Sequence, residues 1–196
     1  YSVDRAELKI TSYQNYSPNY HLSKVMGEGY EPGADWIEWG SGSAGWLYIY
    51  QMTGLEVYIH GYESELQYKL NDVINLEGSF SATRGKNLTD NSSLYYMPPD
   101  RILLSTEVNL LPFSINLMHK KVFSQNRVGL YESATPGYET YNLIGTYTIR
   151  NSWVVHKIIL QVDNVFDRKY YNHLSRIKSI MPEKGRNIGL QYRLNF

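Results

Sequence analysis

The sequence predicts an all-β protein, an antiparallel barrel whose strands cross a membrane, and three observations support this. First, the last eleven residues alternate polar side chains with apolar ones, at Ile188, Leu190, Tyr192, Leu194 and Phe196. A strand of about ten residues that is apolar on one face only has the pattern of a membrane-spanning barrel strand. Second, similar alternating blocks recur along the chain. Third, tight turns and long loops alternate between these blocks.

The alternation predicts eight strands. Their expected positions are residues 5–16, 46 into the sixties, 73–84, 101–110, a strand that starts at 113, 140–150, 153–165 and 186–196. In the first strand, Ala6, Leu8 and Ile10 oppose Glu7 and Lys9. The apolar faces of the next four are expected at Leu55, Val57 and Ile59, at Ile74, Leu76 and Phe80, at Ile102, Leu104 and Val108, and at Phe113, Ile115 and Leu117.

The connections between the strands are of two kinds. Tight turns are expected at Asn71-Asp72, Pro112 and Asn151-Ser152, and long loops at 17–44, 85–100, 124–139 and 166–185. Outer-membrane barrels have short periplasmic turns at one end and long external loops at the other. This alternation therefore places both ends of the chain on the periplasmic side.

Composition excludes several other classes of protein. Mean hydropathy is −0.43, and no apolar run approaches the roughly 18 residues that a membrane-spanning helix needs. Nineteen Lys and Arg balance nineteen Asp and Glu, so no net charge attracts nucleic acid. Cysteine is absent, which excludes disulfides, thiolate zinc sites and cysteine nucleophiles. The aromatic content of 14%, with nineteen Tyr, suits a membrane interface.

Charged residues occupy mid-strand positions on the polar faces, and two architectures explain them. They are Glu7, Lys9, Glu56, Glu77, Glu107, Arg150, Asp163 and Arg193. In a soluble β-sandwich they would form the solvated face, whereas in a wide barrel they would line a polar lumen. Both architectures have a period of two, so the alternation alone does not separate them.

Four short motifs favour the wide barrel. The segment Asp163-Asn164-Val165-Phe166-Asp167-Arg168-Lys169-Tyr170 resembles the Asn-Leu-Phe-Asp-Lys-x-Tyr element of TonB-dependent outer-membrane receptors. Pro182-x-x-Gly185-Arg186-Asn187 then leads into the terminal strand, as in that family. Upstream, Tyr96-Met97-Pro98-Pro99-Asp100-Arg101 is similar to the family's Pro-Pro-x-Arg element, and Thr53-Gly54-Leu55-Glu56 to its Gly-hydrophobic-Glu element. All four stand in the family's order.

The resemblance implies a barrel of about 22 strands that is plugged by a separate N-terminal domain. Since only eight strands are predicted, we expect residues 1–196 to be the C-terminal portion of such a barrel, with the plug domain absent. The strand count by itself favours the alternative of a self-contained small outer-membrane barrel. A soluble carbohydrate-binding β-sandwich is the second alternative, although it leaves the terminal alternation and the ordered motifs unexplained.

The resemblance also implies a function. Receptors of this family, in the outer membrane of Gram-negative bacteria, capture a scarce nutrient such as a ferric siderophore, haem, cobalamin or a glycan. They import it with energy from the TonB complex, which acts through the plug. The other expected partners are outer-membrane lipid and the barrel-assembly machinery, because an apolar face that ends in a terminal Phe resembles the insertion signal. No nucleic acid, cofactor or enzymatic activity is expected.

Aromatic residues in the long loops are candidates for contact with the nutrient. They are Tyr30, Trp36 and Trp39 in the 17–44 loop, and Tyr131 and Tyr138 in the 124–139 loop. Their rings could stack on an aromatic or sugar-like cargo, or they could form the aromatic belt at the membrane interface.

Some motif residues have a physical role that the sequence suggests. Pro98 and Pro99 have no N–H to donate and must lie above the ladder. Arg101 is expected either to pair with a lumen carboxylate, Glu77 or Glu107, or to be a solvated charge at a strand end. A turn is expected at Asn164 and Asp167, and close backbone approach or a bend at Gly185 and Gly189.

Metal and catalytic readings have no support in the sequence. The five histidines are His21, His60, His119, His156 and His173. No two of them have the spacing of metal ligands, and nothing in the sequence favours haem ligation by His21 or His173. The nucleophile-elbow, P-loop, dinucleotide and zincin motifs are all absent from the sequence.

Overall fold

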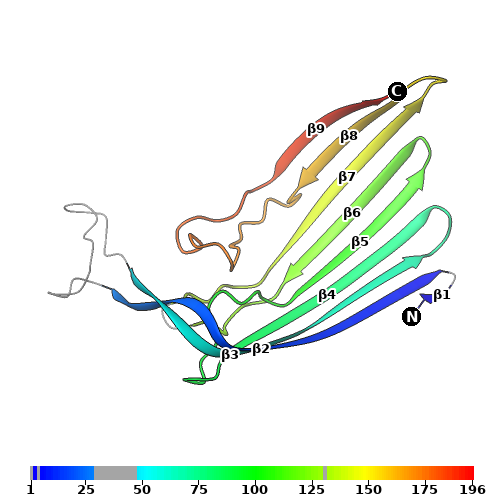
Figure 1. The fold of residues 1–196 in the computed structure, drawn as a ribbon. Helices are drawn as coiled ribbons and strands as arrows, with labels where there is room; N and C mark the ends of the chain where they lie inside the picture. The colour runs from blue at the N-terminus through cyan, green and yellow to red at the C-terminus, as the bar shows by residue number, and fades with distance from the viewer. Residues whose placement is uncertain (1, 4, 29–47, 130–131) are drawn as a thin grey trace, which may run out of the picture.

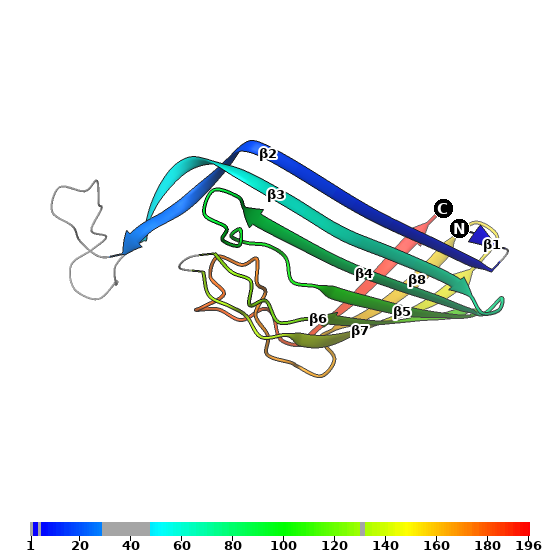
Figure 2. The same cartoon turned by 90° about the horizontal axis from the view of Figure 1, so that it is seen from below.

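The chain forms a single antiparallel sheet in which each strand pairs with its neighbours in the sequence. The computed structural model describes residues 2–3, 5–28, 48–129 and 132–196. The sheet curves into an open trough, with the tight turns, β1 and the C-terminus at one end (Figure 1). Figure 2 shows the trough from below, with the long connections gathered at the other end. Among the described residues, no helix is long and apolar enough to cross a membrane.

The predicted all-β, antiparallel fold is confirmed, and all eight predicted strands are present. The strands are β1 (Ser2–Val3), β2 (Ala6–Glu28), β3 (Tyr48–Lys69), β4 (Ile74–Asn87), β5 (Arg101–Leu110), β6 (Phe113–Val122), β7 (Tyr138–Arg150), β8 (Val155–Asp163) and β9 (Asn187–Asn195). The two-residue strand β1 was not predicted; it pairs with the start of β2.

The prediction that the first strand ends at Tyr16 is wrong. β2 is 23 residues long and β3 is 22, and they stay paired as far as Glu28 and Tyr48. The register shifts between Ser17 and Tyr20, and again between Val25 and Gly27. Such bulges break the period of two, so this part of the strand does not alternate in the sequence.

The predicted tight turns are confirmed, and side-chain chemistry explains the first. Asn71 Oδ1 accepts hydrogen bonds of 2.8 Å from the N–H groups of Val73 and Ile74, which is how Asn stabilises a turn. At the third turn, the N–H of Asn151 donates to the carbonyl of Val154 at 2.9 Å.

The register separates a polar face from an apolar one. Glu7, Gln67, Glu77 and Ser105 lie in one row across β2 to β5. The neighbouring row on the opposite face contains Leu8, Leu66, Gly78 and Leu104. Leu66, Leu104 and Leu160 are 46%, 50% and 46% exposed, so no described part of the chain covers these leucines. An apolar face that is exposed over a whole sheet is the surface that lipid covers in a barrel.

The predicted apolar face of the first half of β3 is wrong. Leu55, Val57 and Ile59 were expected on the apolar face, but they have the parity of Gln67 and so share its polar face. This part of β3 lies beside Asn87 and Lys86, beyond the start of β5. Val57 is fully buried there, so its apolar side chain is shielded from solvent on the polar face. In this part of β3, the polarity of a side chain therefore does not indicate which face meets the membrane.

A tyrosine crosses the polar face of β3 where a glycine makes room for it. Tyr13 lies opposite Gly61, and its hydroxyl is 2.6 Å from Thr83 Oγ1 on β4. A Cβ at position 61 would be 2.5 Å from Tyr13 Cζ and 2.7 Å from the backbone oxygen of Ala82. The glycine thus lets one side chain connect three strands.

We expect Gly61→Ala to destabilise the barrel by about 1–3 kcal/mol, because the methyl group would meet both the ring and the backbone. The measurement is the urea midpoint of the detergent-folded protein. Gly145→Ala is the matched control, since a Cβ at this glycine of β7 meets nothing within 4 Å. Equal midpoints for the two variants would contradict the role given to Gly61.

Candidate functional site

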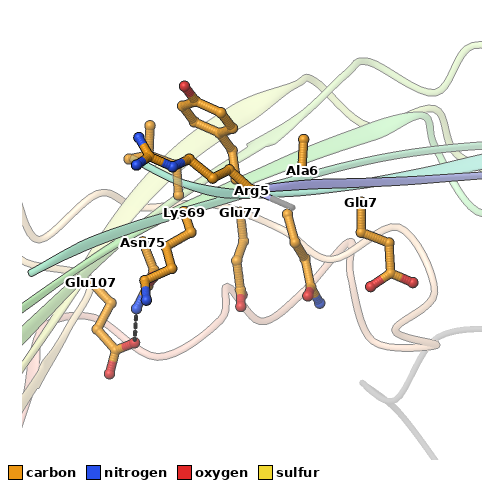
Figure 3. A pocket seen from close by; sticks show the side chains of 10 residues that line it. Arg5, Ala6, Glu7, Lys69, Asn75, Glu77 and Glu107 are labelled. Atoms are coloured by element: carbon orange, nitrogen blue, oxygen red, sulfur yellow. Dashed lines mark hydrogen bonds between the residues drawn. The ribbon is translucent and has the colours of Figure 1, made fainter. Parts of the chain in front are cut away.

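The sheet carries a charged hollow near the tight turns, lined by three glutamates and by the basic residues Arg5 and Lys69. Glu7, Glu77 and Glu107 point to the same side of the sheet, and Ala6 points to the other (Figure 3). The hollow has a volume of about 290 Å³. Asn75 Nδ2 donates a long hydrogen bond of 3.4 Å to Glu107 Oε2. These carboxylates can attract cations or donor groups, as expected for the wall of a polar lumen.

Seven of the eight charged residues that were expected on this face share it by register, namely Glu7, Lys9, Glu77, Glu107, Arg150, Asp163 and Arg193. The prediction for Glu56 is wrong, because its parity in β3 puts it on the face of Leu66. Its Oε1 accepts a hydrogen bond of 2.8 Å from the hydroxyl of Tyr16.

Arg101 does not pair with either carboxylate that was considered for it. Its Nε donates to Ser81 Oγ at 2.9 Å, directly across the ladder. Glu77 lies four positions along β4 from Ser81, or roughly 13 Å at the rise of a strand, which is beyond the reach of an arginine. The alternative of an exposed charge at a strand end is the one observed.

Asp100 of the Pro-Pro-Asp-Arg motif forms ion pairs at the loop end of the sheet. Its carboxylate binds Arg84 through two contacts of 2.5 and 2.7 Å, and Arg127 lies 3.7 Å away. Arg84 holds the pKa of Asp100 below its usual value. As predicted, Pro98 and Pro99 precede the ladder, which begins at Arg101.

Asn164 and Asp167 form the predicted turn beyond β8. Both have left-handed backbone, with φ of 51° and 52°, a conformation that Asn and Asp tolerate. Asn164 is buried; its Nδ2 donates to the carbonyl of Arg168 at 2.9 Å, and its Oδ1 accepts from the N–H of Arg168 at 2.9 Å. Asp167 Oδ1 accepts from the N–H of Arg186 at 2.7 Å.

The two glycines of this region differ. A Cβ on Gly185 would be 2.7 Å from Asp167 Oδ1, so the close approach expected at this glycine is present. A Cβ on Gly189 would meet nothing within 4 Å, so no close approach explains this residue.

Three long connections pack together beyond the strands. We call them loop L1 (88–100), loop L2 (123–137) and loop L3 (164–186). Gln125 of L2 is fully buried, and its Nε2 donates to the carbonyl of Met97 at 2.9 Å and of Pro98 at 3.2 Å. Thr135 Oγ1 lies 2.9 Å from His173 Nδ1 of L3. L2 is therefore bonded to both of its neighbours.

A buried carboxylate lies where these loops meet. The side chain of Glu132 is 3% exposed, and its Oε1 is 3.1 Å from Lys178 Nζ and 3.0 Å from His173 Nε2. Glu132 also accepts hydrogen bonds from the N–H of Tyr96 at 3.2 Å and of Gly129 at 3.1 Å. Sequence reasoning missed this cluster, since its members lie up to 46 positions apart on separate loops.

Of the predicted ligand contacts, only Tyr138 lies within the described residues; Tyr30, Trp36, Trp39 and Tyr131 lie outside them. Tyr138 is the first residue of β7 and is 9% exposed. Its ring stacks on Tyr170 of L3 at 4.3 Å, and Lys120 Nζ lies 5.8 Å from its centroid. Burial, followed by the Glu183 carboxylate, raises the pKa of Tyr170.

The terminal apolar row is intact on β9. Ile188, Leu190, Tyr192 and Leu194 share one face, opposite Val162, Leu160, Ile158 and His156 of β8. Over the described part of the chain, no group of three or more His, Cys, Asp or Glu side chains could hold a metal ion.

No family model matches the chain. The chain is similar to the copper transporter OprC, with a TM-score of 0.77 and 21% identity, over 96% of this chain and 28% of that one. It is similar to the FrpB iron transporter from Neisseria meningitidis, with a TM-score of 0.66 and 14% identity, over 97% and 28% of the two chains.

A third similar structure is the pyoverdine outer membrane receptor FpvA from Pseudomonas aeruginosa PAO1. Its TM-score is 0.67 and its identity 15%, and the match covers 100% of this chain and 28% of that one. The chain has the barrel fold of TonB-dependent receptors. It spans 28% of the length of each of these three proteins. In this receptor fold the polar face is the lumen wall and the apolar face is the lipid-facing surface.

We expect Asn164→Ala to loosen loop L3 of this receptor fold. The variant loses the side-chain hydrogen bonds and puts alanine at a positive φ, which together destabilise by about 1–3 kcal/mol. The measurement is the rate at which trypsin cleaves L3 in intact outer membranes. Asn172→Ala is the control, because Asn172 is exposed and its side chain accepts a single hydrogen bond among the described residues, from the N–H of Leu174. Equal cleavage rates would contradict this account.

Proposed function

We propose that the chain is part of an active transporter in the outer membrane of a Gram-negative bacterium, and that this transporter imports a metal ion or metal chelate. The observation that carries this proposal is the match of nearly the whole sheet to a copper transporter, an iron transporter and a pyoverdine receptor. The exposed apolar face, the charged lumen wall and the split between turns and loops are what such a barrel requires. An enzymatic role is not part of the proposal.

In this proposal, residues 1–196 are the C-terminal portion of a larger barrel, and a plug domain elsewhere in the polypeptide connects it to the TonB complex. The row from Ile188 to Phe196 faces outer-membrane lipid and serves as the signal for the barrel-assembly machinery. Tyr30, Trp36, Trp39 and Tyr131 contact the cargo from the loops. Tyr138 joins them when Tyr170 moves away, because its ring is covered in the present structure.

The placement of β9 against lipid predicts different effects at two adjacent positions. We expect Leu190→Arg to lower the yield of folded protein, because an arginine on the lipid face costs about 2–4 kcal/mol near the bilayer midplane. Gln191→Arg is the matched control on the lumen face, and it should assemble normally. The measurement is the fraction of heat-modifiable protein in the outer membrane. Equal yields of the two variants would contradict the assignment of the Leu190 face of β9 to lipid.

Transport itself is tested by uptake in cells with and without a functional TonB complex. The probes are Cu²⁺, ferric citrate, ferric enterobactin and ferripyoverdine, in a strain that lacks every other receptor for them. We expect uptake of one probe to require both this protein and TonB, whereas surface binding of that probe needs only this protein. Uptake that persists without TonB would favour a self-contained passive barrel, and a soluble product would exclude both.

A further inference from the structure

The cluster around Glu132 connects three loops through one carboxylate. It receives a backbone N–H from Tyr96 of L1, a backbone N–H from Gly129 of L2, and the ammonium group of Lys178 of L3. The side chains of Glu132, His173 and Lys178 are 3%, 1% and 7% exposed. Removing a partner from such a buried charge is far more disruptive than breaking a surface ion pair.

The geometry assigns the proton on His173. Lys178 Nζ lies 3.2 Å from His173 Nδ1, and an ammonium group can only donate. Nδ1 must therefore accept, and the neutral ring carries its proton on Nε2. Nε2 faces Glu132 Oε1 at 3.0 Å, but it lacks the alignment of a good hydrogen bond. In this state one buried carboxylate balances one buried ammonium.

Protonation of His173 would break this balance. The new N–H at Nδ1 would have Thr135 Oγ1 at 2.9 Å and Lys178 Nζ at 3.2 Å, and two cations would share one buried carboxylate. Thr135 is uncharged and does not offset the added charge. Arg176 Cζ and Lys178 Nζ also lie 5.7 and 5.8 Å from the ring centroid of Tyr96, so a third cation contacts the same ring as Lys178.

We propose that Glu132, His173 and Lys178 form a pH-sensitive clasp that holds L1, L2 and L3 together at neutral pH and releases them in acid. L3 also carries Tyr170, whose ring covers Tyr138 at the top of the lumen wall. Release of the clasp therefore frees the loop that covers a predicted cargo contact. The clasp goes beyond the proposed transport function, since it concerns when the loops move and not what the barrel carries.

The direction of the pH effect follows from linkage. Burial lowers the pKa of His173, Lys178 lowers it further, and Glu132 opposes them. When the clasp is open, His173 has an ordinary pKa of about 6.5. The open state thus binds the proton more tightly. Closure is fully favoured above about pH 6.5, and it weakens as the pH falls from there through the lower pKa of the closed state.

The test measures the distance between two loops in the full-length polypeptide as the cell makes it, purified in detergent. Residues 1–196 contain no cysteine. With any cysteine elsewhere in the polypeptide replaced by serine, Ala134→Cys and Ser179→Cys place one nitroxide label each on exposed positions of L2 and L3. Double electron–electron resonance then reports the distance distribution. We expect one narrow distance at about pH 7.5 and a growing longer component towards about pH 5.

Three further variants in the labelled background identify the group responsible. His173→Gln cannot titrate, so the pH response should disappear. His156→Gln changes a histidine on β8, outside the cluster, and should keep the response. Glu132→Gln removes the shared carboxylate and should show the longer distance at both pH values.

Two results would overturn the proposal. One is a wild-type distribution that is the same at both pH values, a result that needs no variant to fold. The other is a response that survives in His173→Gln. The inter-loop distance does not depend on transport. The pH-dependent clasp can therefore be confirmed or contradicted even if the uptake experiment contradicts the proposed transport function.

Discussion

Everything in this structure depends on the unbroken backbone ladder from β2 to β9. A strand whose apolar face meets lipid finds no water for its N–H and C=O groups, so neighbouring strands must satisfy all of them. Between β2 and β9 a meander in which each strand pairs with the next does this, as observed. The ladder also fixes the alternation of faces, and so places Glu7, Glu77 and Glu107 together on the lumen wall.

Beyond the strands, the packing depends on polar contacts instead. Among the described residues of L1, L2 and L3, the buried residues include one apolar residue, Leu94, and five polar ones, Gln125, Thr135, Asn164, His173 and Lys178. Gln125 and Asn164 bond backbone groups of these loops. Such networks are stable when every member has a partner and fail when one is lost. A loop layer of this kind can be ordered and still respond to a single protonation.

Predictions agree with the structure where the residues that determine a feature are close together in the sequence. Residues 101–110 were predicted to be a strand with the bounds of β5, because Ile102, Leu104, Val108 and Leu110 share one parity. The turn at Asn71 and the rim turn at Asn164 and Asp167 were also found, since the side chains that make them are adjacent in sequence. The prediction failed at 17–28, where bulges in β2 break the period of two. At Glu56 and Val57 the period of two persists, but the polar residue lies on the face of Leu66 and the apolar one on the face of Gln67, so polarity gave the wrong face.

The sequence by itself determined the fold class, the strand order, the turns and most of the lumen face, because these depend on spacing along a single strand or between adjacent strands. Only the tertiary structure decided which side chains meet between loops. Arg101 binds Ser81 and not a glutamate, and Asp100 binds Arg84, because the register sets those distances. Glu132, His173 and Lys178 come together only when L2 and L3 fold over each other, a contact that no local pattern records.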